Sequence, residues 1–386
     1  MFERKYVVLQ DKSALGSRSV ETAPTEIKIE ETPLTRAERN DLQRDPRTKA
    51  IAPVMPLKLI KPVQKSPSAD QTSSRSATWG VEAVSATKSN FDGSGVTVAV
   101  MDSGIDLSHP AFSGVNIVQQ NFSDEEDASD TDGHGTHCAG TIFGQDVEGT
   151  RIGIARNIDR ALIAKVFNKD GSASNSSLLR AIQWAVEEGA HVISMSLGSD
   201  FSGYVKWLTE KEGLPVEAAA SIALEDYRAD LNLFSELSEY VQARRADEGC
   251  IIVAASGNAS MRPEYEISAG SPASGTGIIS VGALQKQADT LSVSSFSNDK
   301  VDISAPGVSV GSAVLGGGIE YWDGTSMATP HVAGIAALWA QKQLQERKAI
   351  ESKLLTSCLI SSGTMISLDP SSEPNDVGSG LVQAPV

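Results

Sequence analysis

The sequence predicts an α/β protein with a mostly parallel central sheet, flanked by helices on both faces, and a small α+β domain before it. The first observation is a series of near-continuous apolar segments of strand length, at residues 96–102, 161–167, 191–196, 250–256 and 278–282. The second is that helical segments separate these strands, among them 174–188, which Ser174 can cap, and 326–342. In such sheets, functional residues collect at the carboxyl ends of the strands.

The N-terminal domain is predicted from a shorter pattern. Lys5–Gln10 is a strand candidate, and Thr35–Arg44 is predicted to be a helix because Thr35 and Glu38 have the spacing of a capping box. Residues 49–60 look extended, and the Ser/Pro/Thr-rich stretch that follows has little to bury. We therefore expect an N-terminal domain over residues 1–62, an exposed linker over 63–78 and a main domain over 79–386, with an insertion at about 200–230.

The composition is that of a globular protein. Of the 386 residues, 40% are hydrophobic and 21% charged, and no apolar run approaches the length of a membrane span. Residues 1–10 contain only a short apolar run, too short for the core of a secretory signal. Three cysteines, an odd and low number, argue for a reducing compartment: Cys138, Cys250 and Cys358. We expect a cytoplasmic protein, or a secreted one if a leader has been removed.

The net charge of −16 is unevenly distributed, with +4 on residues 1–75 and −20 on residues 76–386. An acidic main domain repels phosphates, so a nucleic-acid partner is not expected. The basic N-terminal segment is attracted to the acidic remainder, which indicates an intramolecular partner.

Three segments carry the residues that amide hydrolysis requires: a nucleophile, a base, and a group that orients the base. Ser326 stands at the start of a helix, where free N–H groups and the helix dipole would face an oxyanion. His134 lies between two glycines, and its ordinary pKa of about 6.5 suits a proton shuttle. Asp102 supplies a carboxylate directly after a buried strand.

Each of these residues has an ordinary explanation when taken alone. Ser326 would be the N-cap of a core helix, and Asp102 would be a turn former at the end of a strand. A single histidine is more often structural than catalytic, and we expect this of four: His109, His137, His191 and His331. The ordinary explanations do not account for the three segments together.

The segments around Asp102, His134 and Ser326 resemble the signature blocks of the subtilisin-like serine proteases, in that family's order of Asp, His and Ser. The resemblance extends from Trp79 to Ala384. It implies a subtilisin-like fold and a serine endopeptidase that acts on proteins or peptides and needs no cofactor for its chemistry.

The resemblance also implies the role of each residue. Ser326 would form the acyl-enzyme, His134 would act as general base and acid, and Asp102 would hold the histidine tautomer. Asn258 and the Ser326 amide would stabilise the oxyanion. The edge that pairs with an extended substrate would be Ser196, Leu197 and Gly198. The pocket for the residue before the cleaved bond would be lined by small or apolar residues that suit a sizeable uncharged side chain: Ala254, Ala255, Ser256, Gly257 and Gly270.

The N-terminal segment resembles the inhibitory propeptide of these proteases. This implies a zymogen in which residues 50–62 lie in the active-site cleft and Ser326 cuts within this tail or the linker. The intramolecular partner suggested by the charge distribution would then be this inhibitor.

Three questions stay open at this stage. The stretch between Ser199 and Gly249, with a long helix expected from Val216 to about residue 247, either shapes specificity or is a surface insertion without a role. Acidic clusters at 124–132 and 146–148 suit calcium or are solvated loops. The last alternative is a catalytically silent binding module on a protease fold. An α/β-hydrolase is disfavoured because the segment around Ser326 lacks the second glycine of a nucleophile elbow.

Overall fold

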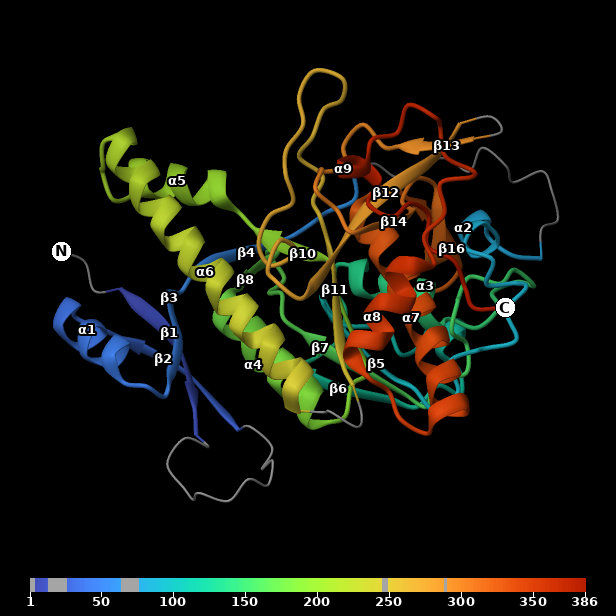
Figure 1. Cartoon of the computed structure of the whole chain (residues 1–386), viewed down its shortest axis with the longest axis horizontal. Coiled ribbons are helices and arrows are strands. Elements are labelled where there is room, and N and C mark those ends of the chain that lie inside the picture. Colours follow the sequence, from blue (N-terminus) through green and yellow to red (C-terminus); the bar gives the residue numbers. More distant parts are fainter. Residues whose placement is uncertain (1–3, 13–25, 64–75, 245–248, 288–289) are drawn as a thin grey trace.

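The structure is a computed structural model that describes residues 4–12, 26–63, 76–244, 249–287 and 290–386. Its central element is an eight-stranded sheet in the order β13-β12-β11-β9-β5-β7-β6, with β14 paired to β12 (Figure 1). All pairs are parallel except β12 with β13. The strands are β5 (Thr97–Asp102), β6 (Ile117–Asn121), β7 (Arg160–Lys165), β9 (Val192–Met195), β11 (Ile251–Ala255), β12 (Ile278–Gln287), β13 (Thr290–Val293) and β14 (Ile303–Pro306).

Helices bury both faces of this sheet, as the apolar strands predicted. Val98 and Val100 of β5 pack in one core with helices α3 (His134–Phe143) and α7 (Thr325–Arg347). Ala99 and Met101 belong to a second core with α4 (Asn175–Glu187) and α6 (Val216–Arg244). The alternation along β5 thus places one helix layer on each face. The shorter elements are α2 (Trp79–Ala83), α8 (Ser352–Ser361), α9 (Pro374–Val377) and the hairpin of β15 (Val310–Ala313) and β16 (Ile319–Trp322).

The N-terminal residues form a small separate sheet that packs on the second helix layer. It has the order β2-β1-β3, all antiparallel, and lies beside α4 and α6 (Figure 1). Its apolar side chains, Val7 and Leu9 among them, share one core with α4 and α6. Helix α1 has the predicted capping box between Thr35 and Glu38. The elements are β1 (Lys5–Asp11), β2 (Ile27–Pro33), α1 (Arg36–Arg44) and β3 (Thr48–Pro53).

The chain then crosses the main domain as an extended segment, here called the strap (residues 54–63). Its strand β4 (Pro56–Leu59) is the central strand of a three-stranded antiparallel sheet with β10 (Leu197–Ser199) and β8 (Ser172–Ser174). The expected linker falls largely on residues 64–75, outside the described residues.

The stretch after β10 contains two helices. The expected long helix is α6, described to Arg244, and α5 (Phe201–Glu210) precedes it without having been predicted as a helix. In the part of the chain that the structure describes, no helix has the length and apolar character needed to cross a membrane.

Candidate active site

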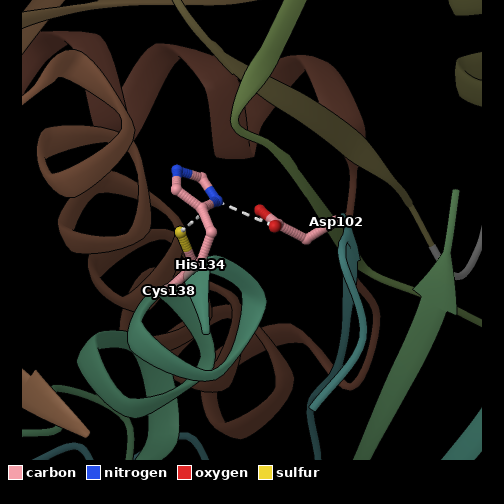
Figure 2. A group of neighbouring side chains, drawn as sticks. All are labelled: Asp102, His134 and Cys138. Atoms are coloured by element: carbon pink, nitrogen blue, oxygen red, sulfur yellow. Dashed lines mark hydrogen bonds and ion pairs between the residues drawn. The ribbon is translucent and has the colours of Figure 1, made fainter. Parts of the chain in front are cut away.

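Asp102 and His134 form a buried hydrogen-bonded pair where β5 ends and α3 begins. The Nδ1 atom of His134 lies 2.8 Å from Oδ1 of Asp102, and both side chains are almost completely buried (Figure 2). Gly133 precedes α3 with a φ of 94°, a conformation that favours glycine. At Gly135 a Cβ atom would lie 2.2 Å from the carbonyl oxygen of Gly104, so only glycine lets α3 begin this close to the end of β5.

The environment of His134 suits a general base that becomes protonated. Burial opposes the charged imidazolium, but the adjacent Asp102 carboxylate outweighs it and raises the pKa of His134 above its ordinary value. Nδ1 faces Asp102, and Nε2 has no hydrogen-bond partner among the described residues. Cys138, one turn further on α3, has its Sγ atom 3.8 Å from Nδ1, and burial raises the pKa of this thiol (Figure 2).

Ser326 lies in the first turn of α7 and is completely buried. Its carbonyl oxygen accepts hydrogen bonds from Sγ of Cys138 at 3.4 Å and from Oγ of Ser196 at 3.3 Å. Cys138 therefore touches the His134 ring and the Ser326 main chain, whereas Oγ of Ser326 donates to the strap and makes no hydrogen bond to Nε2 of His134.

The polar groups of the site are bonded to the main chain of the strap. Oγ of Ser326 donates to the carbonyl oxygen of Ile60 at 2.7 Å. Nδ2 of Asn258 donates to the carbonyl oxygen of Lys61 at 3.1 Å. The orientation of Asn258 is fixed by Thr325, whose N–H and hydroxyl both donate to Oδ1 at 2.9 Å. Because Oδ1 of Asn258 is held by Thr325, the N–H₂ group of Asn258 faces the cleft.

The predicted edge segment holds the strap as an added strand. Leu197 pairs with Leu59, Gly198 pairs with Lys58, and the N–H of Ile60 donates to the carbonyl oxygen of Ser196 at 3.3 Å. Ser196 and Leu197 thus act through their main chain, and the Leu197 side chain is part of the core. This is peptide recognition by β-augmentation.

A cavity of about 1030 Å³ lies beside this edge. Four residues predicted for the substrate pocket line it, together with Gly198 of the predicted edge segment: Ala255, Ser256, Gly257 and Gly270. A Cβ atom at Gly198 would lie 3.5 Å from Cδ1 of Ile60, which locates the Ile60 side chain at this wall. Ala254, which was also predicted to line the pocket, does not line this cavity. Alternate residues of β11 face opposite sides of the sheet, and Ala254 is completely buried in the second core.

Sequence analysis missed a polar group next to the cleft. Asn175, the first residue of α4, accepts from the N–H of Met55 through Oδ1 at 3.1 Å, and its own N–H donates to the Met55 carbonyl at 3.1 Å. Nδ2 of Asn175 donates to the buried carboxylate of Asp230 at 2.8 Å. Asp230 also accepts from Ser199 and Ser271, and burial raises the pKa of its carboxyl group. Asn175 and Asp230 belong to no sequence motif. The sequence predicted only that Ser174 caps the helix on which Asn175 lies.

The other histidines make structural contacts. His137 stacks on Trp322 with ring centroids 4.5 Å apart, and burial lowers its pKa to about 3. Nδ1 of His331 lies 2.8 Å from the Met327 carbonyl oxygen, and burial lowers its pKa to about 4. His109 accepts from the N–H of Ala111, and His191 accepts from the N–H of Thr97.

The acidic clusters bind protein donors. Asp130 accepts from Ser103 and Thr136, and Asp146 forms an ion pair with Arg156. Within the described residues, the one group of three His, Cys, Asp or Glu ligand atoms within 4.8 Å of one another is that of Asp102, His134 and Cys138. Structural calcium stays a prediction.

The fold and the placement of these residues are those expected of a serine hydrolase of the Asp-His-Ser type. A profile of the subtilase family matches residues 93–367, and the chain belongs to this family. It is a serine endopeptidase that acts on proteins or peptides, and this family needs no cofactor for catalysis.

Similar proteins include the thermostable alkaline protease of Halalkalibacterium halodurans, 29% identical over 87% of this chain and 81% of the relative. The intracellular serine protease of Paenibacillus polymyxa is 35% identical over 64% of this chain and 68% of its own. Subtilisin E of Bacillus subtilis is 30% identical over 77% and 74%. Among solved structures, fervidolysin from Fervidobacterium pennivorans matches with a TM-score of 0.67 and 21% identity, over 99% of this chain and 60% of that chain. That match shows the subtilisin-like fold.

Proposed function

We propose that this endopeptidase is a zymogen, inhibited by its N-terminal residues 1–62, that uses Ser326 as nucleophile. The observation that carries the proposal is the 2.7 Å hydrogen bond from Oγ of Ser326 to the carbonyl oxygen of Ile60, on a strand paired with β10. In this arrangement the strap occupies the path of an extended substrate and excludes other peptides from it.

The residues then have distinct tasks. His134 takes the proton of the Ser326 hydroxyl through Nε2 while Oγ attacks the substrate carbonyl carbon, and later gives that proton to the leaving amine. Asp102 keeps Nδ1 protonated and stabilises the imidazolium. Asn258 and the Ser326 amide stabilise the oxyanion of the tetrahedral intermediate.

The contacts of the strap also favour one processing bond, between Ile60 and Lys61. The Ile60 N–H pairs with Ser196, and the Ile60 side chain lies at the pocket wall formed by Gly198. Asn258 is bonded to the Lys61 carbonyl rather than to that of Ile60. A small shift of the strap is needed to bring the Ile60 carbonyl to the oxyanion donors, which explains why the bound strap inhibits before it is cut.

Charge pairs between the N-terminal domain and the main domain agree with the charge distribution. Arg4 is 3.0 Å from Asp226, and Lys58 is 2.8 Å from Asp200. The packing of Val7 and Leu9 in the second core supplies an apolar contact as well. The proposed inhibitor thus binds through its own sheet and through the strap.

The test compares purified wild-type protein with Ser326→Ala. Wild-type protein should yield a chain that begins at Lys61, and a fluorophosphonate probe should label it. Ser326→Ala should keep its intact N-terminus and take no label. An intact Met1 in fully active protein would contradict the zymogen, and absence of labelling under every activating condition would favour the silent binding module.

We also propose a cytoplasmic location. Cys138 is a buried free thiol, which fits a reducing compartment. Fractionation of the native cells with an antibody to this chain tests it, and recovery of the protein from the culture medium would favour the secreted alternative.

A further inference from the structure

A small apolar pocket lies between the two helices of the insertion and shares no residue with the lining of the cavity at Ile60. It is here called the Met55 pocket and is formed by Tyr204 and Leu208 of α5 with Ala219 and Ala223 of α6. The Met55 side chain packs in it and is completely buried, although it belongs to an extended segment that crosses the surface of the main domain. Among the described residues, the other apolar members of this cluster all come from the insertion.

The position of Met55 along the strap is fixed by main-chain pairing on both sides. Residues 57–59 pair with β10, and residues 56–58 pair with β8. Met55 therefore enters its pocket five residues before Ile60. Since an extended strand advances about 3.3 Å per residue, any peptide held in these two ladders brings the same residue to the same place.

Asn175 binds the main chain at this position. It exchanges two hydrogen bonds with the backbone N–H and carbonyl of Met55, and these contacts do not depend on the side chain. The bond to Asp230 holds the Asn175 amide in this orientation. The site thus combines a main-chain clamp that accepts any residue with an apolar pocket that selects the side chain.

We propose that the insertion forms a sixth subsite on the acyl side of the cleaved bond, which takes a medium-sized apolar side chain of an extended protein or peptide substrate. This rests on the proposed function, because the strap defines the register. The insertion is then a specificity element rather than a surface addition without a role.

A peptide series tests the subsite directly. The peptides have the sequence Val-X-Pro-Leu-Lys-Leu-Ile followed by Ala-Ser-Gly, with X as Met, Leu, Gly or Asp, and a shorter peptide starts at the first Leu. The enzyme is the purified full chain in the form that the fluorophosphonate probe labels. The kcat/KM for Met or Leu should exceed that for Gly or Asp by about tenfold, since an apolar side chain leaves water.

Two variants give a matched comparison. Ala223→Phe fills the Met55 pocket and should abolish the preference for Met over Gly. Ala220→Phe adds the same ring to the exposed side of α6 and should keep that preference. Probe labelling and thermal unfolding of both variants show whether each has folded.

The outcomes separate this inference from the proposed function. Equal kcat/KM for all X, with the shorter peptide cleaved after Ile, overturns the subsite and leaves the endopeptidase mechanism intact; the pocket then serves the strap alone. Cleavage at another bond overturns both the register and the subsite. Absence of cleavage together with absence of probe labelling overturns the proposed function itself.

Discussion

In the proposed catalytic centre each side chain comes from the end of a strand or the start of a helix. The strap, in contrast, is held along its length by main-chain pairing and by contacts with an insertion. Asp102 ends β5, His134 begins α3 and Ser326 lies in the first turn of α7. The strap contacts β10, β8 and the helices α5 and α6. The proposed catalytic centre has few groups, and the proposed mechanism needs each of them. The strap is bound through many separate contacts. Substitutions should therefore have large effects in the first region and graded ones in the second.

The largest effect should come from Asp102→Asn. The amide can donate to Nδ1 of His134 and so favours the wrong tautomer, which lowers kcat by about 10⁴-fold in a protease with the same triad. The measurement is kcat with the peptide that carries Met at X. Asp369→Asn, a change at a carboxylate that binds Ser371, is the control and should keep the wild-type rate. A loss below tenfold for Asp102→Asn would contradict the assigned role.

The next effect concerns stability, where the buried histidines His137 of α3 and His331 of α7 act in the opposite direction to His134. His137 and His331 are buried with pKa values lowered to about 3 and about 4, so in acid the unfolded chain binds protons that the folded chain does not. The free energy of unfolding should therefore fall as the pH drops below about 6.5, by roughly 3 kcal/mol per histidine by pH 4. The raised pKa of His134 acts in the opposite direction, because its contribution is present below pH 6.5 and is lost as the pH rises through the folded pKa.

Denaturant unfolding in the Ser326→Ala background, which prevents self-digestion, measures this dependence between pH 7 and pH 5. His137→Gln should make the free energy of unfolding depend less steeply on pH, by the amount that corresponds to about one proton taken up on unfolding. An unchanged slope would show that His137 already takes up a proton in the folded protein.

The third prediction tests the oxyanion donor. Asn258→Ala removes the N–H₂ group that Thr325 orients, and kcat should fall by roughly 10²–10³ with little change in KM, a range measured in a member of this family. The matched control is Asn116→Ala, which removes an exposed amide that donates to the Asp159 carbonyl. A change confined to KM would indicate that Asn258 only binds the peptide.

These first predictions rest on residues that the sequence already singled out. Continuous apolar strands such as β5 predict a parallel sheet because both of its faces are buried, and short motifs mark the strand and helix ends around it. The expectation that residues 50–62 lie in the cleft begins too early in the chain, because residues 50–53 belong to β3 and pair with β1, whereas residues 57–59 of β4 pair with β10. Asn175 and Asp230 are different: they are 55 residues apart, meet only in the folded chain and belong to no motif. Strand β2 has only two apolar residues before its pattern becomes polar, Ile27 and Ile29, which is too short an alternation to predict a strand.

Asn175 binds the strap, and Asn175→Ala should have a moderate effect on peptide binding. It removes the hydrogen bond that the Met55 N–H donates to Oδ1 of Asn175 and leaves Asp230 without one of its donors, while the main-chain N–H of residue 175 keeps its bond to the Met55 carbonyl oxygen. A net value of about 1 kcal/mol for this bond predicts a rise in KM of about fivefold for the ten-residue peptides, with kcat changed much less. A fall in kcat of the same size as the rise in KM would show that Asn175 also acts on the catalytic groups.

Lys58→Ala in the strap should have the smallest effect, a slight weakening of the inhibition by the strap. The ion pair of Lys58 with Asp200 has a short distance of 2.8 Å, but the two side chains are 55% and 31% exposed. Exposed pairs of this kind contribute about 0.2–1 kcal/mol and weaken in salt, so inhibition by the strap should change by less than about fivefold. The rate of self-processing at low and at high salt measures the effect, and Lys58→Arg should keep the wild-type salt dependence. A larger effect that persists in high salt would mean that a single charged contact, rather than distributed main-chain and apolar binding, holds the strap in the cleft.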